Sequence, residues 1–252
     1  MPVNLSSPQD IPAPLAESLS KSIGVFKNID SLDALLEMTD IASLQKDLNS
    51  YAEEQGILGF HFTRANLNRI RAQGLIVQNG DDARKTFLQE HDKRLSSEQK
   101  RNIVRGWDAY FTSQSNNSRD GKVWFNLTLS SLTMRAAEPL LEFYGGEIIH
   151  MPFRNSTDLA SIFKTLGEPL VICCELSTSE LKTFRPLPWG RVWLSAFHAS
   201  VNESATQEDL DVYMDRSLPS DRIKNICAPM SKKFSSKGAP PKPTSSNGLP
   251  HR

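Results

Sequence analysis

The sequence of 252 residues lacks the features that would assign it at once to several common classes of protein. No apolar run reaches about 18 residues, so no transmembrane helix is expected. Glycine-rich phosphate loops of the Walker or dinucleotide-binding type are absent. The three cysteines show no C-x-x-C spacing and the five histidines are scattered, so we expect neither a disulfide framework nor a bound metal.

Net charge is also lacking, because 29 basic side chains are balanced by 29 acidic ones. This balance argues against a protein whose main task is to hold nucleic acid through its phosphates. The composition, 38% hydrophobic and 23% charged, is typical of a globular protein. Three cysteines in such a chain favour a reducing environment.

The two ends of the chain differ in composition from the middle. Residues 1–22 are rich in serine and proline and lack a basic start followed by an apolar stretch, so we expect a flexible segment and no cleaved signal peptide. Residues 231–252 are rich in Ser, Pro, Gly and Lys and contain no acidic residue, which predicts a disordered basic tail. Residues 23–230 would then form a single domain.

Apolar residues between Ser31 and Gly56 recur at helical spacing, with Ser31 as the N-cap and Gly56 as the end. A strand is predicted over 57–63, followed by a helix over 64–73 and a short strand at 75–77. The core candidates of the first helical region are Leu32, Leu35, Leu36, Ile41, Leu44 and Leu48.

The rest of the chain predicts an α+β fold, because helices and short strands follow each other without regular βαβ alternation. Adjacent Cys173 and Cys174 in an apolar run should lie on opposite faces of a strand. The further predicted elements are a loop and charged helix over 79–105, a strand over 122–129, a helix over 131–144 interrupted or ended near Pro139, a loop leading into a strand over 145–153, a helix over 155–167, and strands over 169–176, 191–200 and 209–216.

Four short motifs are candidates for chemistry. They are "HFT" at 61–63, "GKVWFN" at 121–126, "FYGGE" at 143–147 and "DLDVYMDRSLPSDRI" at 209–223. A thiol protease built on Cys173 or Cys174 is an alternative, but cysteines among apolar strand neighbours are usually inert. Taken singly, each motif is explained by ordinary strands, turns and solvated charges.

In their order and spacing the motifs resemble those of the ADP-ribosyltransferase superfamily, in the histidine-bearing branch that includes diphtheria toxin, poly(ADP-ribose) polymerases and RNA phosphotransferases. "HFT" followed by "NLNRIRAQGL" resembles the first family motif, and "GKVWFN" the second, with Trp124 where tyrosine is usual. "DVYMDRSLPSDRI" resembles the third, with Asp211 where glutamate is usual. The resemblance implies a core of two small packed sheets, mixed or antiparallel, with flanking helices.

The resemblance also implies an activity: mono-ADP-ribosyl transfer from NAD, as co-substrate, to a macromolecule, with release of nicotinamide. It implies a bacterial toxin or effector acting on a host protein, with ubiquitin as one candidate acceptor. We expect a monomer without membrane attachment, delivered into the host-cell cytoplasm without a signal peptide; a cytoplasmic protein is the alternative.

The resemblance assigns roles to particular residues. The catalytic carboxylate would be Asp211, with Glu147 or the upstream Glu208 as alternatives, and His61 would bind a ribose hydroxyl beside the reaction. Aromatic rings would enclose the nicotinamide. The expected cofactor-binding residues are His61, Phe62, Thr63, Trp124, Phe125, Asn126 and Tyr144.

Two other functions remain open. Trp124 and Asp211 stand where the family usually has tyrosine and glutamate. These differences favour a non-catalytic module that binds NAD, ADP-ribose or a protein partner. A nucleic-acid ADP-ribosyltransferase or RNA phosphotransferase would need a basic groove near the site. Its candidate residues are Arg64, Arg69, Arg71, Arg84 and Lys85.

Overall fold

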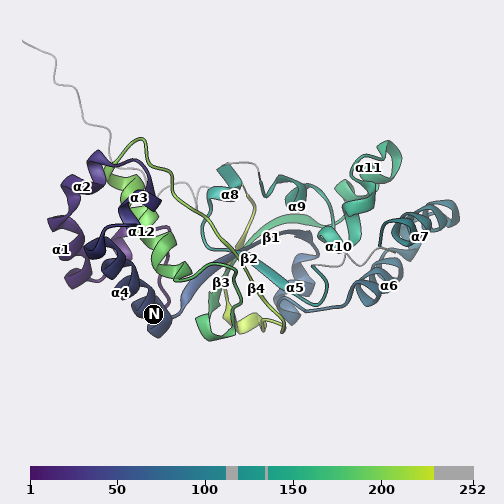
Figure 1. Cartoon of the computed structure of the whole chain (residues 1–252). Helices are drawn as coiled ribbons and strands as arrows, with labels where there is room; N and C mark the ends of the chain where they lie inside the picture. Colours follow the sequence, from purple (N-terminus) through teal and green to yellow (C-terminus); the bar gives the residue numbers. More distant parts are fainter. Residues whose placement is uncertain (112–118, 134–135, 230–252) are drawn as a thin grey trace, which may run out of the picture.

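The computed structural model describes residues 1–111, 119–133 and 136–229, in which one antiparallel sheet lies between two groups of helices (Figure 1). The predicted α+β class is confirmed, but the expectation of two sheets is wrong. The central strand β1 pairs with β2 on one side and with β3 on the other, which joins all strands into the order β4-β2-β1-β3-β5. The strands are β1 (Ile57–Ala65), β2 (Val123–Asn126), β3 (Glu168–Leu176), β4 (Asp211–Met214) and β5 (Ile223–Cys227).

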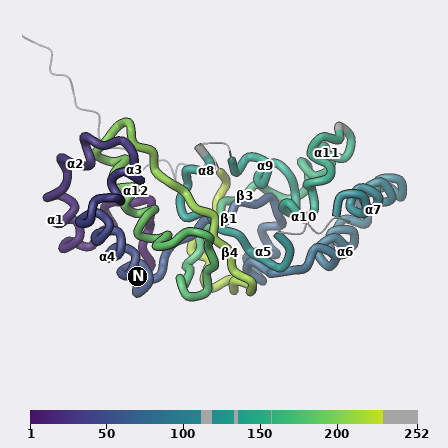
Figure 2. The backbone as a smooth tube through the Cα atoms, viewed as in Figure 1, coloured from purple at the N-terminus to yellow at the C-terminus, as the bar shows by residue number. Residues whose placement is uncertain are grey.

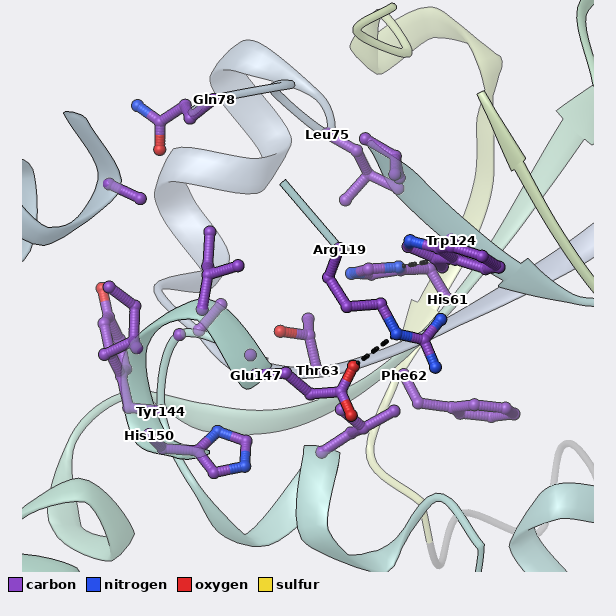
Figure 3. Close-up of a pocket in the computed structure, with 18 of the residues that line it drawn as sticks. His61, Phe62, Thr63, Leu75, Gln78, Arg119, Trp124, Tyr144, Glu147 and His150 are labelled. Carbon is purple, nitrogen blue, oxygen red and sulfur yellow. Dashed lines mark hydrogen bonds and ion pairs between the residues drawn. The ribbon is translucent and has the colours of Figure 1, made fainter. Parts of the chain in front are cut away.

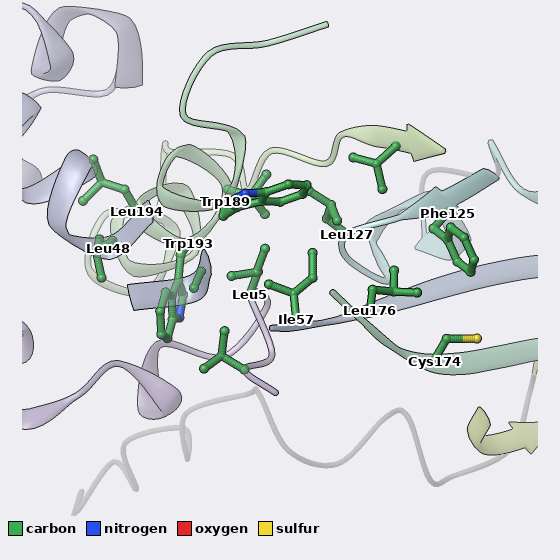
Figure 4. Close-up of a cluster of buried hydrophobic side chains, with 14 of the residues drawn as sticks. Leu5, Leu48, Ile57, Phe125, Leu127, Cys174, Leu176, Trp189, Trp193 and Leu194 are labelled. Atoms are coloured by element: carbon green, nitrogen blue, oxygen red, sulfur yellow. The ribbon is translucent and has the colours of Figure 1, made fainter. Parts of the chain in front are cut away.

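The first helical group packs against one end of the sheet and encloses the largest core (Figure 4). Of the predicted core residues, Leu36 is half-buried and the other five are buried. Ser31 caps α3 by accepting a hydrogen bond from the Ala34 amide at 3.3 Å, and Gly56 ends α4 at φ 75°, as predicted. The group contains η1 (Pro8–Asp10), α1 (Ala13–Lys21), α2 (Ile23–Asn28), α3 (Leu32–Leu36), α4 (Thr39–Gln55) and α12 (Pro188–Val201).

The expectation that residues 1–22 form a flexible segment is corrected by their packing. The Val3 amide donates to the Gly56 carbonyl at 3.0 Å, and Val3 accepts from the Leu58 amide at 2.9 Å. Leu5 and Leu19 are fully buried. The serine- and proline-rich composition predicts flexibility, but a few well-placed apolar side chains are enough to anchor such a segment.

The strand predicted over 191–200 is instead part of α12. Figure 2 shows this helix beside α4 and α2, although more than a hundred residues separate them in the sequence. Val192, Trp193, Leu194 and Ala196 are all buried, because α12 is enclosed by α4, the N-terminal segment and the sheet. A helix that is apolar on every side shows no helical period, so its sequence resembles that of a buried strand.

The second helical group forms a separate core at the opposite end of the sheet (Figure 1). Of the loop and strand predicted over 145–153, the loop is present at Gly145 and Gly146, but the strand is wrong, since residues 147–153 are helical. Phe163 and Ile103 are fully buried in this core. The elements of the group are α6 (Gly80–Glu90), η2 (Asp92–Arg94), α7 (Ser97–Phe111), α10 (Glu147–His150), η4 (Met151–Phe153) and α11 (Thr157–Thr165). Helix α5 (Leu67–Gln73) instead packs through Ile70 into the main core.

The two faces of the sheet contact different cores. Cys174 belongs to the main core, whereas Cys173 packs with Phe60 and Phe62 beneath α9, which confirms that the two thiols lie on opposite faces. Pro139 lies in the first turn of α9 and so begins that helix. The remaining elements are α8 (Ser130–Thr133), α9 (Glu138–Glu142), η5 (Thr178–Glu180) and η6 (Ser220–Arg222).

Two further predictions concern the C-terminal tail and the short strand at 75–77. The tail over 231–252 lies outside the described residues, and Leu75 makes a single bridge to Leu218 in place of a strand at 75–77. In the part of the chain that the structure describes, no helix has the length and apolar character needed to cross a membrane.

Candidate functional site

A cavity of about 500 Å³ lies between β1, β2 and the second helical group. Its walls include residues from all four sequence motifs, although these lining residues lie as far apart in the sequence as His61 and Asp211. Glu208 does not line the cavity, because it forms an ion pair with Arg191 at 2.7 Å. The predicted site residues that line the cavity are His61, Phe62, Thr63, Trp124, Phe125, Asn126, Tyr144, Glu147 and Asp211.

His61 is fixed by a hydrogen bond across the β1–β2 pair (Figure 3). Its Nδ1 lies 2.8 Å from the carbonyl oxygen of Trp124. A carbonyl only accepts, so Nδ1 carries the proton. Burial lowers the pKa of His61, against a smaller opposing effect of this hydrogen bond, and therefore favours the neutral ring. In the neutral ring Nε2 is an acceptor, suited to a ligand hydroxyl.

The second motif presents one aromatic ring to the cavity and buries the other. Phe125 is 1% exposed and packs in the main core, so its ring is not placed to stack on a ligand. Trp124 is half-buried and its ring lies 4.7 Å from that of Tyr213 on β4, between centroids. Of the two residues in this motif that were expected, with Tyr144, to enclose nicotinamide, only Trp124 has the position for stacking.

Asp211 begins β4 directly opposite Asn126 of β2. The Asn126 side-chain amide donates to Asp211 Oδ1 at 2.9 Å, which orients the carboxylate while the residue remains exposed. By contrast, neighbouring Asp209 is enclosed and receives hydrogen bonds from the Leu127 and Thr128 amides at 3.0 and 2.9 Å. Asp209 therefore secures the turn after β2, and Asp211 is the carboxylate of β4 that faces the cavity.

Glu147, at the start of α10, faces Arg119 across the cavity (Figure 3). The Arg119 Nε lies 2.8 Å from Glu147 Oε2, and its guanidinium carbon lies 4.1 Å from the centre of the Trp124 ring. Arg119 thus occupies the ring face that a ligand would need. Arg119 lies outside the four motifs, and nothing in its local sequence links it to Trp124.

Tyr144 closes the opposite wall through contacts with α6. Its hydroxyl donates to Glu90 at 3.2 Å, and Glu90 forms an ion pair with Arg69 at 2.6 Å. Burial, reinforced by the Glu90 charge, raises the pKa of Tyr144 to about 12, so the phenol stays protonated. The ring is 7% exposed, and its expected stacking role is limited to its edge.

His150 also lines the cavity, and no sequence motif points to it. The residue is fully buried, stacks on Phe143 at 5.1 Å between ring centres, and has no hydrogen-bond partner for either ring nitrogen among the described residues. Burial lowers the pKa of His150 to about 4, against a smaller opposing effect of the nearby Gly146 backbone, so the ring is neutral at pH 7. An unpaired buried imidazole is costly, and a polar ligand group would relieve that cost.

The cavity contains more basic than acidic side chains. Arg69 and Arg119 are ion-paired within it, whereas Arg154 has no ion pair in the described parts of the chain. This leaves cationic capacity for an anionic group. The acidic lining residues are Glu90, Glu147 and Asp211, and the basic ones are Arg69, Arg119, Lys122 and Arg154.

Other chemistries find less support. Cys173 and Cys174 are buried, and burial raises the pKa of both thiols, that of Cys173 to about 11, which opposes a nucleophilic role. No cluster of three metal-ligating side chains occurs within residues 1–111, 119–133 and 136–229. Comparisons with family models, with curated proteins and with solved structures found no significant match to this chain.

Proposed function

We propose that the chain is an NAD-dependent mono-ADP-ribosyltransferase that modifies a macromolecular acceptor and releases nicotinamide. The observation that carries the proposal is the convergence of the motifs: His61, Trp124 and Asp211 lie on the adjacent strands β1, β2 and β4 and line one cavity. The cavity volume of about 500 Å³ lies in the usual range for ligand sites, roughly 300–1,000 Å³.

The reaction needs a carboxylate close to the ribose. Cleavage of the bond between nicotinamide and ribose passes through an oxocarbenium-like state, as in glycoside hydrolysis. A carboxylate that accepts a hydrogen bond from a ribose hydroxyl stabilises the developing positive charge. Asp211 suits this role because Asn126 orients one of its oxygens and the residue is open to the cavity.

His61 and Trp124 would position the two ends of NAD. The free Nε2 of His61 can accept a hydrogen bond from the adenosine-side ribose, while the Trp124 ring can stack on nicotinamide once Arg119 moves away. Arg154 supplies a cation for the pyrophosphate. Glu147 becomes available to the ligand when its ion pair with Arg119 opens.

A protein acceptor agrees best with the charges. Of the five residues that would make a basic groove for nucleic acid, Arg69 and Arg84 form ion pairs with Glu90 and Asp81 at 2.6 and 2.7 Å. Arg64 donates to the carbonyl of Leu166 at 2.7 Å. These contacts reduce the free positive charge that phosphates would require.

The second candidate function is a module that binds NAD or ADP-ribose without turnover. It is favoured by Arg119, which covers Trp124 and neutralises Glu147, and by the shorter side chain of Asp211. Such a module would bind NAD but would release no nicotinamide.

Labelled NAD separates the two candidates. The wild-type chain and the variants His61→Ala, Asp211→Asn and Glu147→Gln are incubated with labelled NAD and a cell lysate, and nicotinamide release and label transfer are measured. Loss of one group that stabilises transition-state charge lowers rates by about 10²–10³-fold, so we expect that loss in Asp211→Asn. Asp47→Asn, on the exposed face of α4, is the matched control and should keep full activity. Binding of NAD without nicotinamide release in the wild type would establish the binding module instead.

A further inference from the structure

A second hollow, of about 350 Å³, adjoins the cavity at Asp211. Asn126, Ser131 and Asp211 line both spaces, so the proposed reacting carboxylate stands between them. The remaining wall comes from Asp209, Leu210 and the segment before α12, residues 183–185. A molecule in this hollow and a ligand in the cavity would therefore both reach Asp211.

The segment before α12 is held against the outer edge of β4. The Lys182 amide donates to the Tyr213 carbonyl at 2.8 Å, and the Tyr213 amide donates to the Lys182 carbonyl at 3.0 Å. The Lys182 side chain also pairs with Asp215. This pairing fixes the positions of Phe184 and Arg185 relative to Asp211.

Phe184 is 81% exposed, although it is a large apolar residue. Its ring lies 6.1 Å from that of Tyr213, which lies 4.7 Å from that of Trp124, between centroids. A row of three rings therefore leads from the cavity, across β4, to the rim of the second hollow. A single exposed apolar side chain is ordinary on a protein surface, but its place at the rim of a hollow that reaches Asp211 is specific.

The lining of the hollow carries charges of both signs, from Arg185, Asp209 and Asp211. Arg185 is exposed and has no ion pair among the residues described. Asp209 accepts two backbone hydrogen bonds on one oxygen, and on the other it accepts from the Ser130 and Ser131 hydroxyls at 3.3 and 2.8 Å. With Asp209 occupied in this way and Asp211 assigned to the reaction, Arg185 is the charged side chain beside Phe184 that is left to contact a docked chain.

We propose that this hollow docks the acceptor as a polypeptide segment in which an apolar side chain contacts Phe184 and a neighbouring acidic side chain faces Arg185. The proposal rests on the proposed transferase function. The acceptor's hydroxyl or carboxylate oxygen forms a bond to ribose C1′ as the bond from C1′ to nicotinamide breaks. The electron pair leaves with nicotinamide, which departs neutral, and the proton of a hydroxyl acceptor passes to Asp211.

The test compares transfer with hydrolysis, in which water replaces the acceptor. Wild type, Phe184→Ala, Arg185→Glu and Arg185→Lys are given labelled NAD and lysate proteins, and NAD hydrolysis is measured in parallel without lysate. A random copolymer of glutamate and tyrosine serves as an acidic, aromatic competitor for the docking site, and polylysine serves as the basic competitor. Val104→Ala, another exposed apolar residue on the remote helix α7, is the matched control.

We expect Phe184→Ala and Arg185→Glu to lose at least about 10-fold of protein labelling, since each removes one contact at the rim of a docking site. Their NAD hydrolysis should stay within about two-fold of wild type, because neither residue lines the NAD cavity. Arg185→Lys should keep most of the labelling, and only the glutamate copolymer should compete with wild type. Unchanged labelling in both variants, competition by polylysine alone, or label in RNA would overturn the docking proposal while hydrolysis continues. Absence of both hydrolysis and labelling in the wild type would instead reject the transferase function.

Discussion

The two helical ends of the molecule differ in how they satisfy buried polar groups. At the first end, His198 is 1% exposed and its Nε2 donates to the Ile29 carbonyl at 2.8 Å. Asn202 donates to the carbonyls of Phe26 and Ile29 at 3.1 and 3.3 Å. At the second end, fully buried His150 has no partner for either nitrogen in the described part of the chain.

The difference concerns the two histidines, because Ser6 Oγ in the N-terminal segment is also buried without a partner among the described residues. Buried polar groups in native proteins nearly always have hydrogen-bond partners, so exceptions require an explanation. His150 and the Trp124 indole nitrogen, both unpaired among the described residues, belong to residues that line the cavity. We expect variants at the first end to lower stability and variants at the second end to alter ligand binding.

The largest expected effect is the loss of stability when Trp193 at the first end is replaced, compared with the loss when Trp124 beside the cavity is replaced. Trp193 is fully buried and its indole donates to the Ser7 carbonyl at 3.0 Å, so Trp193→Ala should lower the free energy of unfolding by about 3–5 kcal/mol. Trp124→Ala removes a half-buried ring and should cost about 1 kcal/mol. Urea unfolding measures both changes. Equal losses in the two variants would contradict the distinction between scaffold and site.

The stability of the folded chain at low pH should show whether His150 is held neutral. Because the pKa of His150 is about 4 when folded and about 6.5 when unfolded, the unfolded state binds the proton first as the pH falls. Stability should therefore decline below about pH 6.5, by roughly 3 kcal/mol at pH 4 from this residue.

The variant His150→Phe should lose this part of the acid dependence, whereas His198→Phe should lower stability at pH 7 by removing the shorter of the two hydrogen bonds to the Ile29 carbonyl. Unfolding free energies at several pH values measure both. An unchanged acid dependence in His150→Phe would show that His150 is not held neutral.

NAD should stabilise the folded chain through the second end alone. At 100 times its dissociation constant a ligand adds about 2.7 kcal/mol to the free energy of unfolding. We expect a corresponding rise in melting temperature in the wild type, and a much smaller rise in Trp124→Ala and His150→Phe. Leu48→Val, in the scaffold core, should melt earlier but keep the full NAD-induced increment. Loss of that increment in Leu48→Val would mean that the two ends are coupled.

The smallest effect should come from Arg119. Its guanidinium covers the Trp124 ring at 4.1 Å, a contact worth about 0.5–1 kcal/mol at an exposed site. The variant Arg119→Ala removes this contact and should therefore tighten binding of a nicotinamide-bearing ligand by about 2- to 5-fold, as measured by calorimetry. Lys85→Ala, on the exposed side of α6, is the control. Weaker binding in Arg119→Ala would assign Arg119 a contact with the ligand itself.

Local sequence chemistry predicted much of the fold. Ser31, Gly56 and Gly74 mark helix ends because capping and positive φ depend on single residues. Strand β1 was predicted from its composition and position alone. The packing of α12 and of the N-terminal segment was missed, because each depends on partners distant in the sequence.

The site divides in the same way. His61, Trp124 and Asp211 follow from ordered motifs, and the structure brings all three to one cavity. Arg119 and His150 have no local sequence signature. Arg119 is placed by its contact with the Trp124 ring in β2, and His150 is notable because its ring nitrogens have no hydrogen-bond partner among the described residues. β5 was missed as well, because a short, half-buried edge strand has weak periodicity.

The adjacent cysteines give the chain two internal reporters for alkylation experiments. Both thiols are buried with raised pKa, so an alkylating reagent should modify them only when the structure opens. Cys174 reports on the face beneath the main core, and Cys173 on the face beneath α9, which continues toward the cavity. The ratio of their labelling rates, with and without NAD, would therefore measure how far a ligand slows the opening of one face of the sheet relative to the other.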